Sequence, residues 1–281
     1  MLRWKIGQVS VTRVVDDEIS SIGHLLLPQA TPEILRPIPW MAPFLDDQGR
    51  LTLSIHALVV ESRGRRILVD TCLGNDKERP IVPEWHLRST SFLSDLSAAG
   101  APRESVDLVL CTHLHLDHVG WNTMRVDDRW VPTFPNARYL FARKEWEFWK
   151  DQPEELGPVI TDSVRPIVEA GLADLVEMNH ALTDEVRLEP TPGHTPGHVS
   201  VRIRSAGEEA VITGDMMHHP CQIAHPEWST VLDHNADDSH KTRLDFLGRC
   251  AQTPVLVIGT HFVTPTAGRI VRDGDTYRLD C

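Results

Sequence analysis

Long apolar runs are missing from this sequence of 281 residues. A helix that crosses a bilayer needs about 18 or more predominantly apolar residues, and no such run occurs. The N-terminal segment carries Arg3, Lys5 and Asp16 and lacks the apolar stretch of a signal peptide. We therefore expect neither a membrane-spanning helix nor a secretory leader.

Clusters of basic residues are also scarce. The sequence has 28 Lys and Arg against 40 Asp and Glu, a formal net charge of −12, and no basic run is longer than the pair Arg65-Arg66. Proteins that bind nucleic acids or anionic membranes rely on cationic side chains that neutralise phosphates. This charge balance argues against nucleic acids and anionic membranes as partners. We therefore expect a small molecule as the partner.

Cysteine is too rare and too scattered for a disulfide framework. An odd number of widely spaced cysteines is typical of proteins from a reducing compartment. We therefore expect a cytoplasmic protein. The five cysteines are Cys72, Cys111, Cys221, Cys250 and Cys281.

Apolar periodicity predicts many strands with a few interspersed helices, which is typical of an α/β layered fold. We expect one domain over residues 1–281, with functional residues where strands end. Strands are predicted near 9–15, 53–61, 66–70, 106–111, 138–142, 174–178, 185–189, 198–204, 209–213 and 255–258, with a hairpin over 268–279, and helices over 91–99, 144–150, 163–170 and 237–250.

A proline-rich loop over residues 24–50 interrupts this pattern. Its five prolines exclude a regular helix or a central strand. An apolar loop of this kind either packs on the body of the protein or forms a pocket wall. We expect Trp40, Met41 and Phe44 to line the mouth of a substrate pocket.

Histidine, in contrast, is abundant, with 15 residues in the chain. Four metal-binding side chains fall in the pattern His-x-His-x-Asp-His directly after an apolar strand: His113, His115, Asp117 and His118. Histidines two apart in an extended segment point the same way, and a helix that begins near Asp117 would turn the other two toward them. Such donors suit zinc best and iron or manganese less well. The alternative is a polar loop with unrelated histidines.

Further donors follow strand-to-loop transitions downstream. A glycine-opened turn over residues 190–198 carries His194 and His198, one strand runs into Asp215, and another runs into His261. Each of these residues taken alone would more often have a structural role. A sheet can nevertheless present all of them at one edge.

Taken as a set and in this order, these motifs resemble the metallo-β-lactamase superfamily over almost the whole chain. The resemblance implies an αββα sandwich with two metal ions at one sheet edge. His113, His115 and His194 would hold the first ion, and Asp117, His118 and His261 the second, with Asp215 bridging both. Asp70 would orient a ligating imidazole, and His198 would support the site or fill the core. Two zinc ions are expected, with manganese, iron or cobalt as alternatives.

The ligand set also discriminates between branches of the superfamily. The commonest β-lactamases have Cys at the position of Asp215, and flavo-diiron enzymes have Glu at the position of His115. The residues found here therefore argue against both branches and favour the dinuclear hydrolases. The proline-rich loop, the block 134–139 and Glu145-Trp146 look similar to acyl-homoserine lactonases and methyl-parathion-type hydrolases. One departure is His218, because such lactonases usually carry Tyr three residues after the bridging Asp.

The resulting hypothesis is a metal-dependent hydrolase that opens a lactone or cleaves a small apolar carboxylic ester. Asp117 or Asp215 would accept a proton, and His218 would donate to the substrate unless it and His219 form an exposed turn. Trp85, Trp121, His219 and Phe262 complete the expected pocket. The alternatives are a phosphotriesterase, a non-catalytic metal-binding module and a mononuclear iron dioxygenase. We expect a homodimer, as in relatives.

Overall fold

The computed structural model describes residues 1–281 and contains two large β-sheets. The first has the strand order β1-β2-β3-β4-β5-β8-β9 and the second runs β10 to β15 in sequence order. The first sheet comprises β1 (Arg3–Ile6), β2 (Val9–Ile19), β3 (Leu53–Ser62), β4 (Arg65–Val69), β5 (Leu108–Leu110), β8 (Arg138–Ala142) and β9 (Ala173–Val176). The second comprises β10 (Val186–Pro190), β11 (Val199–Ser205), β12 (Glu208–Ile212), β13 (Leu256–Ile258), β14 (Ala267–Asp273) and β15 (Thr276–Asp280).

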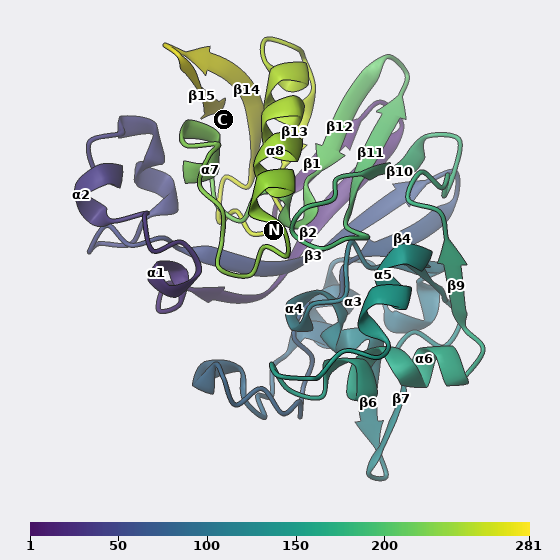
Figure 1. Cartoon of the computed structure of the whole chain (residues 1–281). Coiled ribbons are helices and arrows are strands. Elements are labelled where there is room, and N and C mark those ends of the chain that lie inside the picture. The colour runs from purple at the N-terminus through teal and green to yellow at the C-terminus, as the bar shows by residue number, and fades with distance from the viewer.

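Helices cover the outer face of each sheet (Figure 1). The α-helices are α1 (Gly23–Leu26), α2 (Pro32–Leu35), α3 (Phe92–Ala98), α4 (Leu116–Val119), α5 (Arg143–Trp149), α6 (Arg165–Glu169), α7 (Cys221–Ala224) and α8 (Ala236–Cys250). Short 3-10 turns occupy Pro39–Phe44, Pro83–Trp85, Arg103–Ser105, Gly120–Asn122 and Gly214–Met216, and a π-helical turn covers Ile160–Val164. None of these helices is long and apolar enough to cross a membrane.

Three apolar clusters hold these layers together. One lies between the sheets and includes Leu58, Val60 and Ile212. The next residues along the same strands, Val59 and Val211, face the outer clusters, because side chains alternate across a strand. Strands buried on both faces explain the near-continuous apolar runs in the sequence. The arrangement confirms the predicted αββα sandwich.

The predicted elements agree with the structure to within a few residues, but some elements were not anticipated. These are the edge strand β1, the short helix α7, and the hairpin of β6 (Thr123–Val126) and β7 (Arg129–Pro132). The proline-rich segment also contains single helical turns. Pro32 and Pro39 stand at the first positions of such turns, where the missing N–H of proline costs no hydrogen bond.

The topology brings several strand ends to one edge of the sandwich. β4 and β5 are parallel in the first sheet, and β12 and β13 are parallel in the second. β10 also runs parallel to β12, because each is antiparallel to β11 between them. The segments that follow these five strands therefore meet, and they carry Asp70, His113, His194, Asp215 and His261.

Candidate metal centre and active site

Three imidazoles meet at one side of this edge. His113 and His115 lie in the extended segment between β5 and α4, and His194 lies in the turn after β10. Their potential ligand atoms all lie within 4.8 Å of one another. Nδ1 of His115 is 2.9 Å from Nε2 of His194, so these two rings aim nitrogen atoms at the same point.

A second group forms beside the first. α4 begins at Leu116 and turns Asp117 and His118 toward His261, which follows β13. Nε2 of His118 and Nε2 of His261 are each 3.6 Å from an oxygen of Asp117. These two nitrogen atoms are 3.3 Å apart. The carboxylate of Asp117 and the imidazoles of His118 and His261 therefore surround one small volume.

Asp215 lies between the two groups. Its Oδ2 atom is 3.5 Å from Nε2 of His194 and 3.3 Å from Nε2 of His118. Nε2 of His113 is 3.7 Å from the same oxygen and has no hydrogen-bond partner, although it is buried. A buried nitrogen without a partner is costly unless something else binds it. The residues present therefore fit a pair of metal ions that share Asp215.

Burial controls the charge of the first group. Burial, followed by the neighbouring imidazoles, lowers the pKa of His113 and of His115 well below the ordinary value. Both rings are therefore neutral, which is the form that binds metals. Burial opposes ionisation of Asp215, but the charges of His118 and His261 outweigh it and hold the pKa of that carboxyl well below its usual range.

Asp70 fixes the orientation of His118. Asp70 accepts the backbone N–H of Thr112 at 2.7 Å and the Thr112 hydroxyl at 3.0 Å. Its Oδ2 atom lies 3.0 Å from Nδ1 of His118. The carboxylate thereby leaves Nε2 of His118 free to face the centre, which is the arrangement that orients metal-binding imidazoles in proteins.

His198 holds the backbone of Asp215 in place. Its Nε2 accepts the backbone N–H of Asp215 at 2.8 Å, and its Nδ1 donates to the carbonyl of Thr191 at 2.9 Å. Burial lowers the pKa of His198 to about 3, so the ring is neutral. Gly214 must remain glycine here, because its φ is +55° and an added Cβ would lie 2.5 Å from Nε2 of His198.

Two supporting carboxylates were not recognised from the sequence. Asp233, in the segment before α8, lies 2.9 Å from Nδ1 of His194 through Oδ1. Glu145 on α5 is buried and accepts the backbone N–H of Leu114 at 3.2 Å and of Gly197 at 2.8 Å. Glu145 therefore ties together the two loops that carry histidines. Asp233 belongs to no motif, and Glu145, three residues after β8, was noted only for its resemblance to the lactonases. Only their spatial proximity to the histidine loops identifies the supporting role of both.

His218 and His219 have different surroundings. His218 is 3% exposed, and its Nε2 lies 3.1 Å from Oδ2 of Asp215 while its Nδ1 has no hydrogen-bond partner. His219 donates through Nε2 to the carbonyl of Phe44 at 2.9 Å. The exposed-turn alternative is therefore wrong for both residues, and His219 supports the fold rather than the pocket.

An apolar cavity of about 280 Å³ opens onto this cluster. Its polar residues belong to the cluster: His115, Asp117, Asp215, His218 and His261. Its walls are mainly aliphatic and come from segments far apart in the sequence: Ile22, Leu25, Leu26, Leu53, Ile55, Ile81, Val82, Trp85, Leu116, Leu156, Val231 and Leu232.

The predicted aromatic wall is wrong except at Trp85. Met41, Phe44 and Phe262 pack with Trp40 on the outer face of the second sheet. Trp121 stacks on Phe92 under the first sheet, with ring centroids 5.7 Å apart. None of these aromatic residues, nor Met41 or His219, lines the cavity. The proline-rich segment packs on the body through its large side chains, and only its first turn, near Leu25, reaches the cavity.

Comparison with known proteins identifies a family for this chain. A model of the metallo-beta-lactamase superfamily matches residues 51–261. The N-acyl homoserine lactonase of Bacillus cereus is 25% identical over 167 residues, which is 55% of this chain and 60% of that protein. The lactonase AiiA of Bacillus thuringiensis subsp. kurstaki is 24% identical over 174 residues, 58% and 63% of the two chains. The matches thus span less than two thirds of the length of these relatives.

Solved structures with the same fold cover the whole chain. AidC, described as a dizinc quorum-quenching lactonase, aligns with a TM-score of 0.82 and 22% identity, over 99% of this chain and 96% of that one. A hydrolase of the beta lactamase superfamily named AbOPH aligns with a TM-score of 0.81 and 25% identity, over the same shares. Because the family model matches most of the chain and the fold agrees, the chain belongs to the metallo-β-lactamase superfamily.

Proposed function

We propose that this chain is a dinuclear metal hydrolase that opens a lactone or cleaves a small apolar carboxylic ester. The observation that carries this proposal is the position of Asp215 between two groups of metal-binding side chains at the floor of an apolar cavity. A metal-binding module without catalysis would not need such a cavity. An iron dioxygenase with three ligands would leave Asp117, His118 and His261 without a role.

The proposed ligands divide into the two groups already described. His113, His115 and His194 would hold one ion, Asp117, His118 and His261 the other, and Asp215 would contact both. Bound zinc ions would supply hydroxide near neutral pH and polarise the substrate oxygen. The donor set of imidazoles and carboxylates suits zinc, with manganese, iron and cobalt as alternatives.

Protein side chains would then manage the proton and the substrate oxygen. Asp117 lines the cavity with 17% of its side chain exposed, so its carboxylate can receive a proton released at the cavity floor. Asp215 can do the same, but its side chain is 4% exposed and already contacts several imidazoles. An N–H of His218 would donate to the substrate oxygen, since this ring also lines the cavity.

The cavity walls favour an aliphatic substituent on the substrate. Burying apolar surface stabilises a complex by roughly 25 cal/mol per Å², and the walls present branched aliphatic side chains. Relatives named as N-acyl homoserine lactonases support a lactone as the reacting group. Tetrahedral phosphotriesters are the alternative substrates. All five cysteines are free, which supports the cytoplasmic location that we also propose.

A substrate panel on metal-loaded protein tests this proposal. The panel contains alkyl-substituted lactones, aryl esters and phosphotriesters, with the Asp215→Ala variant as the inactive control. We expect the highest kcat/KM for alkyl lactones and loss of all turnover in the variant. Preferential turnover of phosphotriesters would replace the proposed substrate class, and no turnover of any class by protein with two bound metals would reject the hydrolase proposal.

A further inference from the structure

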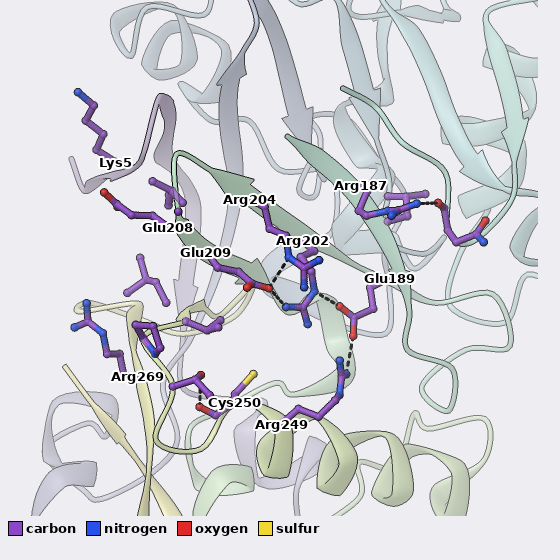
Figure 2. A pocket seen from close by; sticks show the side chains of 18 of the residues that line it. Lys5, Arg187, Glu189, Arg202, Arg204, Glu208, Glu209, Arg249, Cys250 and Arg269 are labelled. Atoms are coloured by element: carbon purple, nitrogen blue, oxygen red, sulfur yellow. Dashed lines mark hydrogen bonds and ion pairs between the residues drawn. The ribbon is translucent and has the colours of Figure 1, made fainter. Parts of the chain in front are cut away.

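A second cavity, of about 830 Å³, lies at the other end of the second sheet and shares no residue with the apolar cavity. It is formed by β10, β11, β12, the end of α8 and neighbouring segments (Figure 2). Arg204 on β11 lies five residues from Val199 at the metal-ligand end, or about 17 Å at the rise of a strand. The proposed hydrolase makes no use of this cavity.

The charge of this cavity is opposite to that of the chain. Its lining contains three acidic residues: Glu189, Glu208 and Glu209. It contains six basic ones: Lys5, Arg187, Arg202, Arg204, Arg249 and Arg269. The surplus is positive, although the chain as a whole has a net charge of −12. Basic side chains are therefore concentrated here against the overall composition.

Two of the carboxylates hold three arginines in place. Glu189 contacts both Arg202 and Arg249, the latter at 2.6 Å. Glu209 contacts Arg202 and lies 3.0 Å from Nε of Arg204. Figure 2 shows these ion pairs as one chain across the cavity. Pairing of this kind orders the guanidinium groups before any ligand arrives, which reduces the entropy cost of binding.

The ion pairs do not use all the donors. Arg204 is paired only through Nε, so its two Nη atoms donate to no protein acceptor. Lys5 and Arg269 form no ion pair, and Arg187 donates only to the carbonyl of Asn179 at 3.3 Å. These cations come from different strands and surround the ordered arginines. All four side chains are exposed, so their donors are open to a ligand.

We propose that this cavity binds a small organic anion that carries at least two negative charges. Its volume falls in the range of small-molecule sites, about 300–1,000 Å³. Guanidinium groups pair with planar or tetrahedral oxyanions through two N–H donors. Leu188, Val255 and Leu256 add apolar surface to the lining, which an organic framework would contact. The proposal is independent of the hydrolase function.

Calorimetric titration of the metal-loaded protein with naphthalene trisulfonate tests this site. Sulfonates are weak zinc ligands, so this probe favours the arginine cavity over the metal centre. We expect saturable binding that weakens with added salt, and far weaker binding of naphthalene monosulfonate. The double variant Arg187→Gln/Arg269→Gln should bind the trisulfonate at least about tenfold more weakly, because it removes two cationic donors from the lining.

A matched variant separates a local site from a general charge effect. Arg36 and Arg129 are exposed and lie outside the cavity, so Arg36→Gln/Arg129→Gln removes the same charge elsewhere. This control should bind the probe like the parent. Absence of saturable binding by the parent, or equal weakening in both double variants, would overturn the proposal.

Discussion

The carboxylate of Asp233 lies 2.9 Å from Nδ1 of His194 and is itself fixed by Thr230. Asp233 accepts the backbone N–H of Thr230 at 3.1 Å and its hydroxyl at 3.0 Å. The contact determines which nitrogen of His194 faces the metal centre. Asp233 is thus equivalent in role to Asp70 beside His118, although the two residues come from unrelated segments.

Replacing Asp233 by Asn should weaken metal binding without removing a proposed ligand. The amide lacks the charge that polarises the imidazole, and loss of such a partner costs about 10- to 100-fold in metal affinity or activity. Competition with a chromophoric chelator measures the affinity. Asp237→Asn, an exposed change on the first turn of α8, is the control. Equal affinities of the two variants would contradict a positioning role for Asp233.

Replacing Asp215 by Ala should change the metal stoichiometry. The carboxylate contacts imidazoles of both groups, so its removal should cost at least one of two metals and nearly all turnover. Elemental analysis after desalting gives the metal content, with Asp245→Ala on the exposed side of α8 as the control. Two tightly bound metals in the Asp215→Ala protein would show that the ligand assignment is wrong.

The sequence was most informative where chemistry coincides with a strand end. His113 and His261 follow short buried strands, and such transitions are recognisable from apolar runs. Asp233 and Glu145 were missed because a supporting carboxylate needs only to be near its imidazole or loop in space. The prediction of an aromatic pocket wall was wrong for a related reason. An apolar side chain such as Phe44 satisfies a core and a pocket equally well, and only tertiary packing decides between them.

The aliphatic cavity wall should govern substrate affinity. Leu232→Ala shortens a wall residue that is 42% exposed, so we expect KM for an alkyl lactone to rise about two- to fivefold with little change in kcat, the result of lost uniform binding. Trp40→Ala is the comparison, because Trp40 packs on the outer cluster. That variant should lose thermal stability and keep its kinetics. A raised KM in Trp40→Ala together with an unchanged KM in Leu232→Ala would indicate that Trp40 lines the pocket after all.

Asp162 should be critical for stability. It pairs with Arg79 at 2.8 Å and lies 3.6 Å from Nζ of Lys77, and both cationic side chains are fully buried. Asp162→Ala leaves these charges uncompensated, so unfolding in urea should show a loss of about 3–5 kcal/mol. The exposed pair of Arg125 and Asp128 provides the control: Asp128→Ala should cost less than about 1 kcal/mol.

The stability loss in Asp162→Ala should also depend on pH. Burial lowers the pKa of Lys77 from 10.5 to about 7, and removal of Asp162 should lower it further. The deficit due to charged Lys77 is therefore largest at low pH and disappears as pH rises past about 7. Urea unfolding should show a smaller difference from the parent at about pH 8 than at about pH 6. A difference that grows with pH would contradict this assignment of the buried charge.

His218 tests how much of the proposed chemistry depends on the protein rather than on the metals. It lines the cavity within 3.1 Å of Asp215, and in the proposed mechanism its N–H would stabilise a developing oxyanion or protonate the leaving oxygen. Loss of such a donor costs roughly 2.7–4 kcal/mol, or a hundred- to a thousand-fold in kcat. The variants are His218→Ala and His218→Phe, with metal content measured first so that lost metal is not taken for lost chemistry.

The neighbouring histidine supplies the matched control for that experiment. His219 is equally buried and contacts the carbonyl of Phe44, so His219→Gln should lower stability and leave kcat unchanged. If His218 is a donor, both of its variants lose turnover while they keep two metals and a normal fold. A kcat within about threefold of the parent, or roughly 0.7 kcal/mol, would remove His218 from the mechanism and leave polarisation of the substrate oxygen to the metals alone.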